Sequence, residues 1–280
     1  MVRAYAFPRE LTPDARYAVA IDGTGLFVFK ADPAAVVRFG IEGRSEVVVT
    51  VPQPVRPAVV RPLALGIKPQ IDGNRVLFAI DKPCTISLEI DGDLRRPLFL
   101  FADPAGDEPA PGNGRVRRFK GGMVHEAGVM DLDDGETVFI EEGAVVRGAV
   151  RSLGKNNITL CDRGILDGSR FGRMDCRMAQ VENCRGFTVR DVMIANGRHW
   201  EIVPVNCDSV SISGVRIVSN ADCDDGMDIV GCRDVRIRGC FVRTKDDCIA
   251  IKANRYNWMQ ATGVDCDVDN VHVSDSVFWR

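Results

Sequence analysis

The sequence lacks the segments that would place a protein in a membrane. Its first ten residues, MVRAYAFPRE, do not contain the apolar stretch of a secretory signal, and no segment approaches the roughly 20 apolar residues of a membrane-spanning helix. We therefore expect a protein without a membrane partner. It should be cytoplasmic, or periplasmic or secreted if a leader has been removed.

Basic clusters and metal-binding cysteine pairs are also missing. The chain has 36 Lys and Arg against 39 Asp and Glu, a net charge of −3, and no run of Lys and Arg is dense enough to follow a phosphate backbone. Nucleic acid is therefore excluded as an expected partner. The ten cysteines include no Cys-x-x-Cys pair of the kind that binds zinc. We interpret them as buried thiols and expect no metal and no cofactor.

The first hundred residues contain short β-branched or aromatic segments separated by turn signals such as DGTG, DGN and DGD. No helical pattern of comparable length competes with them, so they predict a β-sandwich. A tract rich in Pro, Gly and Asp, DPAGDEPAPGNG at 103–114, has the composition of a linker. With 280 residues and 45% hydrophobic content the chain suits two domains, and we place the first at residues 1–114.

Beyond the linker the chain repeats itself by spacing. Five segments share the pattern apolar–polar–apolar, and their first residues are 29, 23, 25 and 36 positions apart: Ile158–Leu160, Phe187–Val189, Val210–Ile212, Val235–Ile237 and Val271–Val273. Cys184, Cys207 and Cys232 each precede one of them and should stack inside the coils as apolar fillers. Such repeats, without helical spacing, predict an all-β fold that ends in a right-handed parallel β-helix at residues 115–280. The longest step then contains a loop at 253–267.

Two acidic pairs, Asp224–Asp225 and Asp246–Asp247, each run into an apolar segment. Asp225 and Asp247 are 22 residues apart, close to one coil, so they should lie on neighbouring rungs about 4.8 Å apart. Adjacent strand residues point to opposite faces, so Asp246 can join them only where the chain bends. Three carboxylates in one cleft repel one another, which raises the pKa of at least one. Such a cluster can supply both a general acid and a general base.

At these residues the chain resembles glycoside hydrolase family 28, the polygalacturonase-like enzymes. DDGMDI at 224–229 takes the place of that family's N-T-D-G-φ-D segment, in which φ is apolar, and DDCIAI at 246–251 matches its second acidic segment. Weaker similarities lie at GILDG (164–168), HWEIVPVNC (199–207) and GETVFIEEGAVVRGAV (135–150). VRPLALGI at 60–67 and PLFLFADP at 97–104 are similar to the N-terminal domain of family 49 dextranase-like enzymes.

The resemblance implies a carbohydrate substrate and a role for each carboxylate. Asp246 would protonate the leaving glycosidic oxygen, while Asp225 and Asp247 would position and deprotonate the attacking water. The reaction would invert the anomeric centre, with carboxylates about 6.5–9.5 Å apart and no metal ion.

Further residues near the acidic pairs are candidates for substrate binding. Trp200, flanked by Arg198 and His199, lies about one coil before the first pair and could be a sugar-stacking platform or an ordinary core or edge aromatic. Lys252 directly follows the second acidic segment and could contact substrate or be a surface lysine. Asp228 closes the first segment and is a further candidate.

The resemblance is incomplete. Asp222 or Asp224 could take the role given to Asp225, although the 22-residue step favours Asp225. The family's Gly-His-Gly and Arg-φ-Lys motifs do not occur, and His272 is on the outward side of its strand, so the basic pair that grips galacturonate is not seen. Sugar, linkage and mode of attack stay open, with a dextran-like α-glucan as an alternative substrate. A non-catalytic glycan-binding β-helix and a uronate lyase or epimerase are alternative functions.

The sequence stops just after the strand predicted at Val271–Val273, without a polar capping segment. An uncapped terminal coil exposes apolar side chains and unpaired backbone groups to water. We expect an N-terminal fragment of a longer enzyme that holds the three carboxylates but lacks C-terminal coils. Its hydrolysis should then be feeble or absent, because acid–base groups without substrate-positioning partners lose much of the rate.

Overall fold

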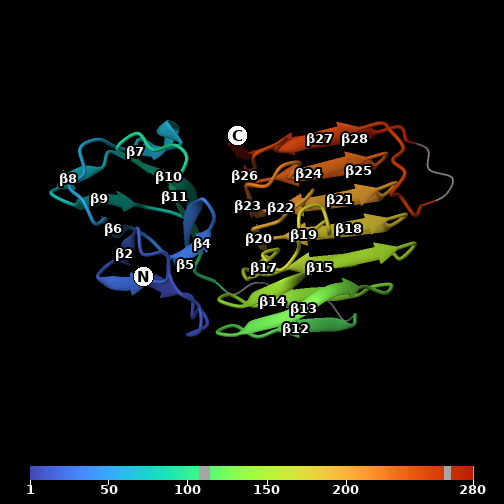
Figure 1. The fold of residues 1–280 in the computed structure, drawn as a ribbon, viewed down its shortest axis with the longest axis horizontal. Helices are drawn as coiled ribbons and strands as arrows, with labels where there is room; N and C mark the ends of the chain where they lie inside the picture. Colours follow the sequence, from blue (N-terminus) through green and yellow to red (C-terminus); the bar gives the residue numbers. More distant parts are fainter. Residues whose placement is uncertain (107–113, 262–265, 280) are drawn as a thin grey trace. The chain divides into compact units, whose positions relative to one another are not determined.

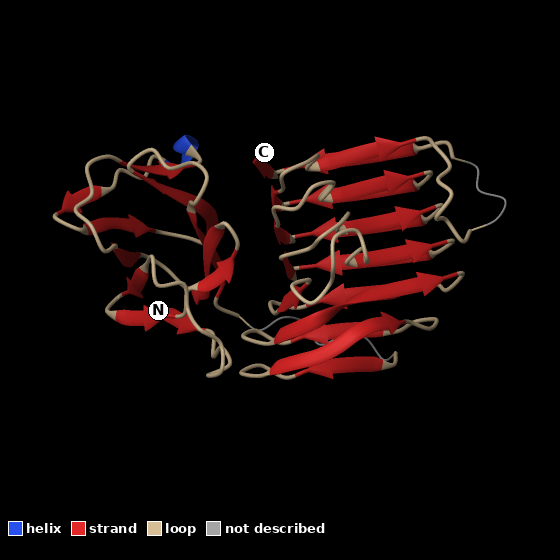
Figure 2. Ribbon diagram, viewed as in Figure 1, coloured by secondary structure: helices blue, strands red, loops and turns tan. Residues whose placement is uncertain are grey.

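The computed structural model describes residues 1–106, 114–261 and 266–279. The chain forms two compact units, residues 1–107 and 108–280, and nearly all of its regular structure is β (Figures 1 and 2). Within the described ranges the only helix is the single turn η1 (Leu63–Leu65), and none is long and apolar enough to cross a membrane.

The tract predicted as a linker is only partly described. Its residues 107–113 lie outside the described residues. Its first two residues, Asp103 and Pro104, belong to the end of strand β11 (Leu98–Pro104), which is paired with a neighbouring strand over its whole length. The sandwich therefore continues into the tract, because backbone pairing overrides the turn preference of Asp and Pro there.

The first unit is a β-sandwich of two sheets. One sheet has the order β1-β5-β11-β10-β7 with β4 paired on β5, and the other has the order β3-β2-β6-β9-β8. The further strands of the first sheet are β1 (Val2–Ala4), β4 (Phe29–Ala31), β5 (Ala34–Ile41), β7 (Ala58–Arg61) and β10 (Cys84–Ile90). Those of the second sheet are β2 (Ala18–Ile21), β3 (Thr24–Leu26), β6 (Ser45–Thr50), β8 (Gln70–Asp72) and β9 (Arg75–Ile80).

Side chains from both sheets meet in one core. In β6 and β9 buried residues alternate with more exposed ones, as expected for strands with one face on the core. Val47 and Val76 from one sheet pack in the same buried cluster as Leu88 and Leu100 from the other. The sandwich predicted from the short alternating segments is confirmed.

The second unit is a right-handed parallel β-helix, and all of its described strand pairs are parallel (Figure 1). One sheet has the order β12-β14-β16-β19-β22-β25-β28. Its strands are β12 (Val116–Phe119), β14 (Thr137–Ile140), β16 (Ile158–Cys161), β19 (Arg185–Arg190), β22 (Asp208–Ser213), β25 (Arg233–Arg238) and β28 (Asp269–Ser274).

A long strand, β15 (Val145–Leu153), divides the remaining strands into two further faces. Its first part pairs with β17 and its last part with β18, and the two series continue separately from coil to coil. One face holds β17 (Ile165–Asp167), β20 (Met193–Ala195), β23 (Arg216–Val218), β26 (Phe241–Arg243) and β29 (Val277–Trp279). The other holds β18 (Ala179–Glu182), β21 (Ile202–Val205), β24 (Met227–Val230) and β27 (Ile249–Lys252), and β13 (Val124–Asp131) pairs with β15.

The strand cores found by spacing are in register. The partners on successive coils are Ile158 with Phe187, Phe187 with Val210, Val210 with Val235, and Val235 with Val271. Each of the irregular steps in the sequence therefore measures one coil. The β-helix prediction is confirmed.

The longest step contains the predicted loop. Between β27 and β28, residues 253–261 and 266–268 form no strand, and residues 262–265 lie outside the described part of the chain. The loop prediction is confirmed for the residues that are described.

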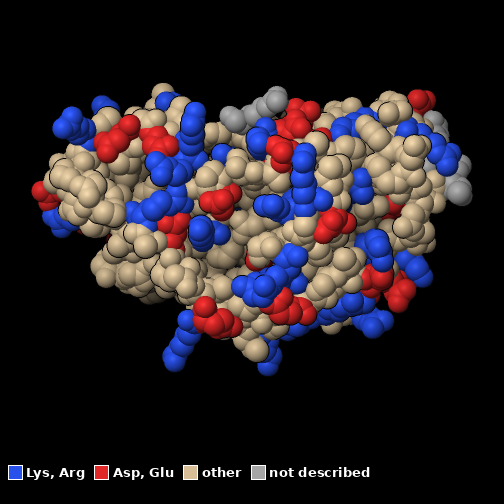
Figure 3. All heavy atoms as spheres, in the orientation of Figure 1, with Lys and Arg blue, Asp and Glu red and all other residues tan. Residues whose placement is uncertain are grey.

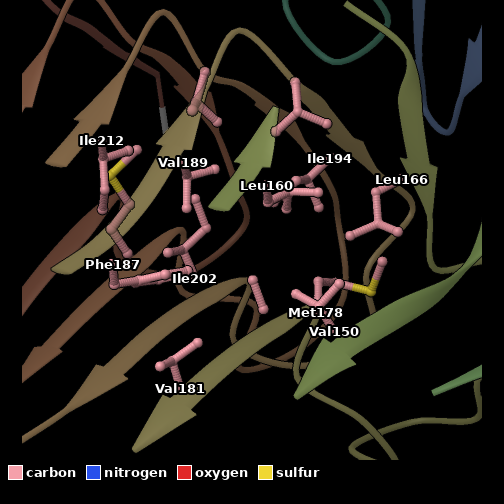
Figure 4. Close-up of a cluster of buried hydrophobic side chains, with 14 of the residues drawn as sticks. Val150, Leu160, Leu166, Met178, Val181, Phe187, Val189, Ile194, Ile202 and Ile212 are labelled. Carbon is pink, nitrogen blue, oxygen red and sulfur yellow. The ribbon is translucent and has the colours of Figure 1, made fainter. Parts of the chain in front are cut away.

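The inside of the coils is a continuous apolar column. Figure 4 shows side chains such as Phe187 and Ile202 gathered there from successive strands. Cys184, Cys207 and Cys232 stack in the same column as free thiols that are at most 2% exposed. Burial raises the pKa of the Cys207 thiol well above its usual range, so it is not a nucleophile near neutral pH. Their predicted role as apolar fillers is confirmed.

Charges of both signs are mixed on the surface. Figure 3 shows Lys and Arg interspersed with Asp and Glu on the face that it displays. A mixed surface does not steer ligands of one charge over long distances. Selectivity on this face must therefore come from local sites.

Replacing Phe187 with Ala should lower the free energy of unfolding by about 3–5 kcal/mol, because it leaves a cavity in the column. The Phe187 side chain is fully buried, whereas its neighbour Thr188 is only half-buried. The control Thr188→Ala should cost less than about 1 kcal/mol. Chemical denaturation of both variants measures the difference, and equal losses would contradict the inward assignment of Phe187.

Candidate active site

The three predicted carboxylates lie in turns just before two neighbouring strands. Asp225 precedes β24, while Asp246 and Asp247 precede β27. The Gly226 amide donates a hydrogen bond of 2.8 Å to the Asp247 carbonyl oxygen, so the two turns stand on successive rungs. None of the three aspartates is part of a strand. This is the bend that allows adjacent residues to reach one cleft.

The carboxylates of Asp225, Asp246 and Asp247, hereafter the acidic cluster, converge. One oxygen of each lies within 4.8 Å of one oxygen of each of the others. Asp225 is only 5% exposed, whereas Asp246 is half-buried and Asp247 is exposed. The cluster is thus fixed on its inner side and open to water on its outer side. The predicted convergence is confirmed, and the catalytic roles stay predictions.

Asp224 holds the turn that carries the second acidic pair. Its Oδ1 accepts hydrogen bonds from the backbone amides of Lys245 (2.9 Å) and Asp246 (3.0 Å), and its Oδ2 accepts one from Ala221 (2.9 Å). The side chain is fully buried, and burial raises the pKa of Asp224 against the effect of these bonds. Asp224 is therefore a structural carboxylate.

Asp222, the other competing residue, is not one of the three converging carboxylates. It is exposed and pairs with the ammonium of Lys245 and, at 3.5 Å, with the guanidinium of Arg173. Asp225 is consequently the residue of the first acidic segment that meets the second pair, as the 22-residue step predicted.

Gly226 permits the close approach of the two rungs. A Cβ atom at this position would lie 2.6 Å from the carbonyl oxygen of Cys248 and 2.5 Å from Cγ1 of Val242. Any side chain here would push apart the backbones that carry Asp225 and Asp247.

Lys252 connects the acidic cluster to a buried acid. Its ammonium lies 2.8 Å from Oδ2 of Asp225 and forms an ion pair with Asp228. The Lys252 side chain is 17% exposed, so the alternative interpretation as a surface lysine is wrong. Burial disfavours its charged form, but the hydrogen bonds with Asp225 and Asp228 outweigh burial and raise the pKa of Lys252. The lysine is a fixed positive charge beside the cluster.

Asp228 has no exposed surface. Burial raises its pKa to about 8, with an opposing effect from Lys252 and a further increase from Asp225. The sequence analysis made Asp228 a candidate for substrate binding, but a covered side chain has no surface to offer a sugar. The prediction that Asp228 binds substrate is therefore wrong. Asp228 is buried on the outer face of the coil, where it is a partner of Lys252.

The loop after β27 is attached to the outer face of the coils. Oε2 of Glu182 in β18 accepts hydrogen bonds from the backbone amides of Gln260 and Ala261, both at 2.8 Å. Met259 packs in a small buried cluster with Val230 of β24. The described start of the loop is therefore held against the strands that lead out of the acidic turns.

Trp200, Tyr256 and Trp258 form an aromatic wall next to Lys252. The Trp200 ring lies 5.4 Å from that of Tyr256 and 5.6 Å from that of Trp258, edge to face in both cases. The Lys252 ammonium lies 3.5 Å from the Trp200 ring centre, and the Arg177 guanidinium lies 3.6 Å from that of Trp258. Cations over aromatic rings attract their negative faces. The wall is thus held together by edge contacts and by two cations.

Of the residues flanking Trp200, Arg198 has an exposed side chain whereas His199 is 6% exposed. Burial and the nearby Arg177 lower the pKa of His199, which keeps the imidazole neutral near pH 7. Trp200 itself is half-buried. Among these three candidates, Arg198 therefore offers the largest surface to a ligand.

Four residues of this region were not found from the sequence: Glu182, Arg177, Tyr256 and Trp258. The two aromatic residues had a usable signal, because they lie in the predicted loop that directly follows the second acidic segment. Arg177 and Glu182 had none, since neither belongs to a motif or repeats with the coil.

The converging oxygens could also hold a cation. The Lys252 ammonium, however, already lies 2.8 Å from Asp225 and offsets part of the negative charge that would attract a cation. The residues present fit a cluster balanced by a lysine better than a metal site.

Comparison with known proteins agrees with this geometry. Residues 167–269 match the family model of glycosyl hydrolases family 28. This part of the chain is family 28-like. The polygalacturonase of Juniperus ashei is 29% identical over 80 residues, which are 28% of this chain and 16% of that protein. Polygalacturonase QRT2 of Arabidopsis thaliana is 29% identical over 85 residues, 30% of this chain and 19% of that protein.

The matched segments thus span less than a fifth of the length of these relatives. Among solved structures, Dex49A from Penicillium minioluteum has a TM-score of 0.55 at 13% identity and covers 99% of this chain and 80% of its own. At this identity the likeness shows the fold. This likeness of fold covers nearly the whole chain.

The titration of Asp228 should make stability depend on pH. Its folded-state pKa, about 8, lies above the ordinary value of 3.8, so the folded protein retains a proton that the unfolded chain has lost. The resulting stabilisation is fully present below about pH 4 and is lost as the pH rises to about 8. Asp228→Asn should therefore gain stability relative to the wild type across this range, by an amount on the order of a few kcal/mol.

Denaturant titrations at pH 4 to 8 measure this trend, with Asp222→Asn as the matched control. Lys245 and Arg173 lower the pKa of the exposed Asp222 below its ordinary value of 3.8. Its contribution to stability is therefore fully present above about pH 4 and does not change at higher pH. The control should differ from the wild type by a constant amount between pH 5 and 8. If the difference in unfolding free energy between Asp228→Asn and the wild type is also constant over this range, Asp228 does not retain a proton in the folded protein.

Proposed function

We propose that this protein is a polygalacturonase-like glycoside hydrolase that cleaves O-glycosidic bonds of a poly- or oligosaccharide. The observation that carries the proposal is the convergence of Asp225, Asp246 and Asp247 from two successive rungs. Hydrolysis of a glycosidic bond needs one carboxyl group to protonate the leaving oxygen and another to activate water or attack the sugar. The match of residues 167–269 to a glycoside hydrolase family supports the same chemistry.

In the proposed reaction Asp246 is the general acid. It passes its proton to the glycosidic oxygen as the bond to the anomeric carbon breaks. Asp225 and Asp247 hold a water molecule, and one of them takes its proton as the water oxygen attacks the anomeric carbon from the opposite side. The products are a sugar with a new hydroxyl at that carbon and a released alcohol.

The spacing of the carboxylates differs from the gap of about 6.5–9.5 Å expected for inverting enzymes. Their nearest oxygens lie within 4.8 Å of one another. A water oxygen about 2.7–2.8 Å from each of two carboxylate oxygens spans up to roughly 5.5 Å. One water can therefore bridge two members of the acidic cluster, so inversion is proposed with a shared water rather than with a wide gap.

Two observations favour hydrolysis over the alternative functions. A lyase or epimerase needs a group that abstracts a proton from carbon, but Lys252, the lysine in contact with the acidic cluster, is paired with two carboxylates, which raise its pKa. A purely binding β-helix has no need for three carboxylates in one place, where they repel. The substrate is proposed to be a polygalacturonan-like glycan, with a dextran-like α-glucan as the competing class.

Asp246→Asn should abolish hydrolysis and spare binding. General acid–base catalysis contributes roughly 100- to 10,000-fold, and asparagine cannot donate the proton. Product release from polygalacturonan and dextran is measured with reducing-sugar assays, and affinity is measured by calorimetry with the same glycans. Asp222→Asn, which alters an exposed acid outside the cluster, is the control. Turnover by Asp246→Asn equal to that of the control would remove Asp246 from the acid role.

The first product should carry the inverted anomeric configuration. Attack by water opposite to the leaving group changes α to β or β to α in a single displacement. Proton NMR of the reaction mixture, recorded before mutarotation, identifies the released anomer. A retained configuration would contradict the shared-water displacement and would make one carboxylate a covalent nucleophile.

A further inference from the structure

The residue that joins the acidic cluster to the rest of the fold is Lys252. It ends β27, whereas Asp228 lies in the neighbouring strand β24, and the two strands are paired in parallel register. Ile229 of the same strand belongs to the apolar column, so Asp228, its neighbour along the strand, faces outward. Lys252 bridges this outward carboxylate to Asp225 at the edge of the cleft.

The Lys252 ammonium has three partners. It lies 2.8 Å from Asp225, contacts Oδ1 of Asp228, and stands 3.5 Å from the centre of the Trp200 ring. Below about pH 8 Asp228 keeps its proton, so it accepts a hydrogen bond from the ammonium through its unprotonated oxygen. An ammonium group has three donors on a flexible stem. Two carboxylates and one aromatic face use its capacity, so the group is held in place instead of moving with solvent.

The surroundings of Lys252 explain why it stays there. Its side chain is 17% exposed, that of Asp225 7%, and that of Asp228 is fully covered. Lys252 and Asp225 are the charged groups that affect the pKa of Asp228. Asp228 in turn has an electrostatic effect on the Arg177 guanidinium. Weak screening by water strengthens these contacts relative to those of an exposed pair.

We propose that Lys252 is a positioning residue that fixes the carboxylate of Asp225 for the hydrolytic step, and that Asp228 is the anchor of Lys252. This inference rests on the proposed function. Lys252 holds one oxygen of Asp225, which restricts rotation of that carboxylate relative to Asp246 and Asp247 on the next rung. A water bridged by the cluster then meets oxygens at fixed positions, and pre-organised geometry of this kind accelerates a reaction without contact to the substrate.

Kinetics of Lys252→Met test the positioning role. The variant keeps most of the apolar stem but loses the ammonium, so kcat should fall about 100-fold while KM stays within about threefold of the wild type. Asp228→Leu, which removes both oxygens of the anchor at a similar side-chain volume, should lower kcat about tenfold in the same way. Lys245→Met is the matched control, since Lys245 pairs with the exposed Asp222 outside the cluster and should leave kcat unchanged.

The split between kcat and KM decides the outcome. An unchanged kcat in Lys252→Met would overturn the inference. A rise in KM of more than about tenfold would make Lys252 a substrate contact and overturn it as well. If Lys252→Met does not fold, the Asp228→Leu kinetics carry the same decision.

Nitrogen NMR of the lysine ammonium groups gives a readout that does not need activity. In the wild type the Lys252 ammonium should exchange its protons with water much more slowly than that of Lys245, whose side chain is 55% exposed. Asp228→Leu should speed the exchange of Lys252 alone. Equal exchange rates for Lys252 and Lys245 in the wild type would show that the anchor is absent. If the wild type hydrolyses no glycan, the proposed function fails, but slow exchange would still establish the anchored lysine.

Discussion

The backbone hydrogen bonds between stacked coils are the interaction on which the rest of this structure depends. They bring residues one coil apart in the sequence into contact. The Glu201 amide binds the Asp225 carbonyl oxygen and the Gly226 amide binds that of Asp247, both at 2.8 Å, so three rungs are joined at the acidic turns. The spacing of parallel strands is nearly constant. Side chains at matching positions therefore meet at a fixed height, and a glycine is required where two turns come closest.

Some charged residues around the acidic cluster are candidates for catalysis, whereas others hold those candidates in place. Asp224 accepts three backbone amides and shapes the turn that carries Asp246. Lys252 balances Asp225 and is held by Asp228. Carboxylates that repel one another can stay together only when such partners offset the cost of their closeness. The supporting carboxyl groups of Asp224 and Asp228 are fully buried, whereas Asp246 and Asp247 keep contact with solvent.

A second layer outside the coils limits what the cleft can contact. The start of the loop after β27 is fixed by Glu182 through two backbone amides, and it brings Tyr256 and Trp258 against Trp200. This layer covers part of a face that would otherwise be open to water. Asp228, which faces outward from the coil, has no exposed surface, and the Lys252 ammonium lies over the Trp200 ring.

The sequence by itself determined the features that follow from a constant coil height. The strand cores at Phe187, Val210 and Val235, the inward cysteines and the pairing of Asp225 with Asp247 could all be counted along the chain, because each coil adds one rung and side chains alternate in direction along a strand. Only the tertiary structure decided the environment of Asp228, the partners of Lys252 and the place of Arg177. These depend on which outward side chains a loop covers and on how long side chains turn across neighbouring strands, and neither follows a period in the sequence.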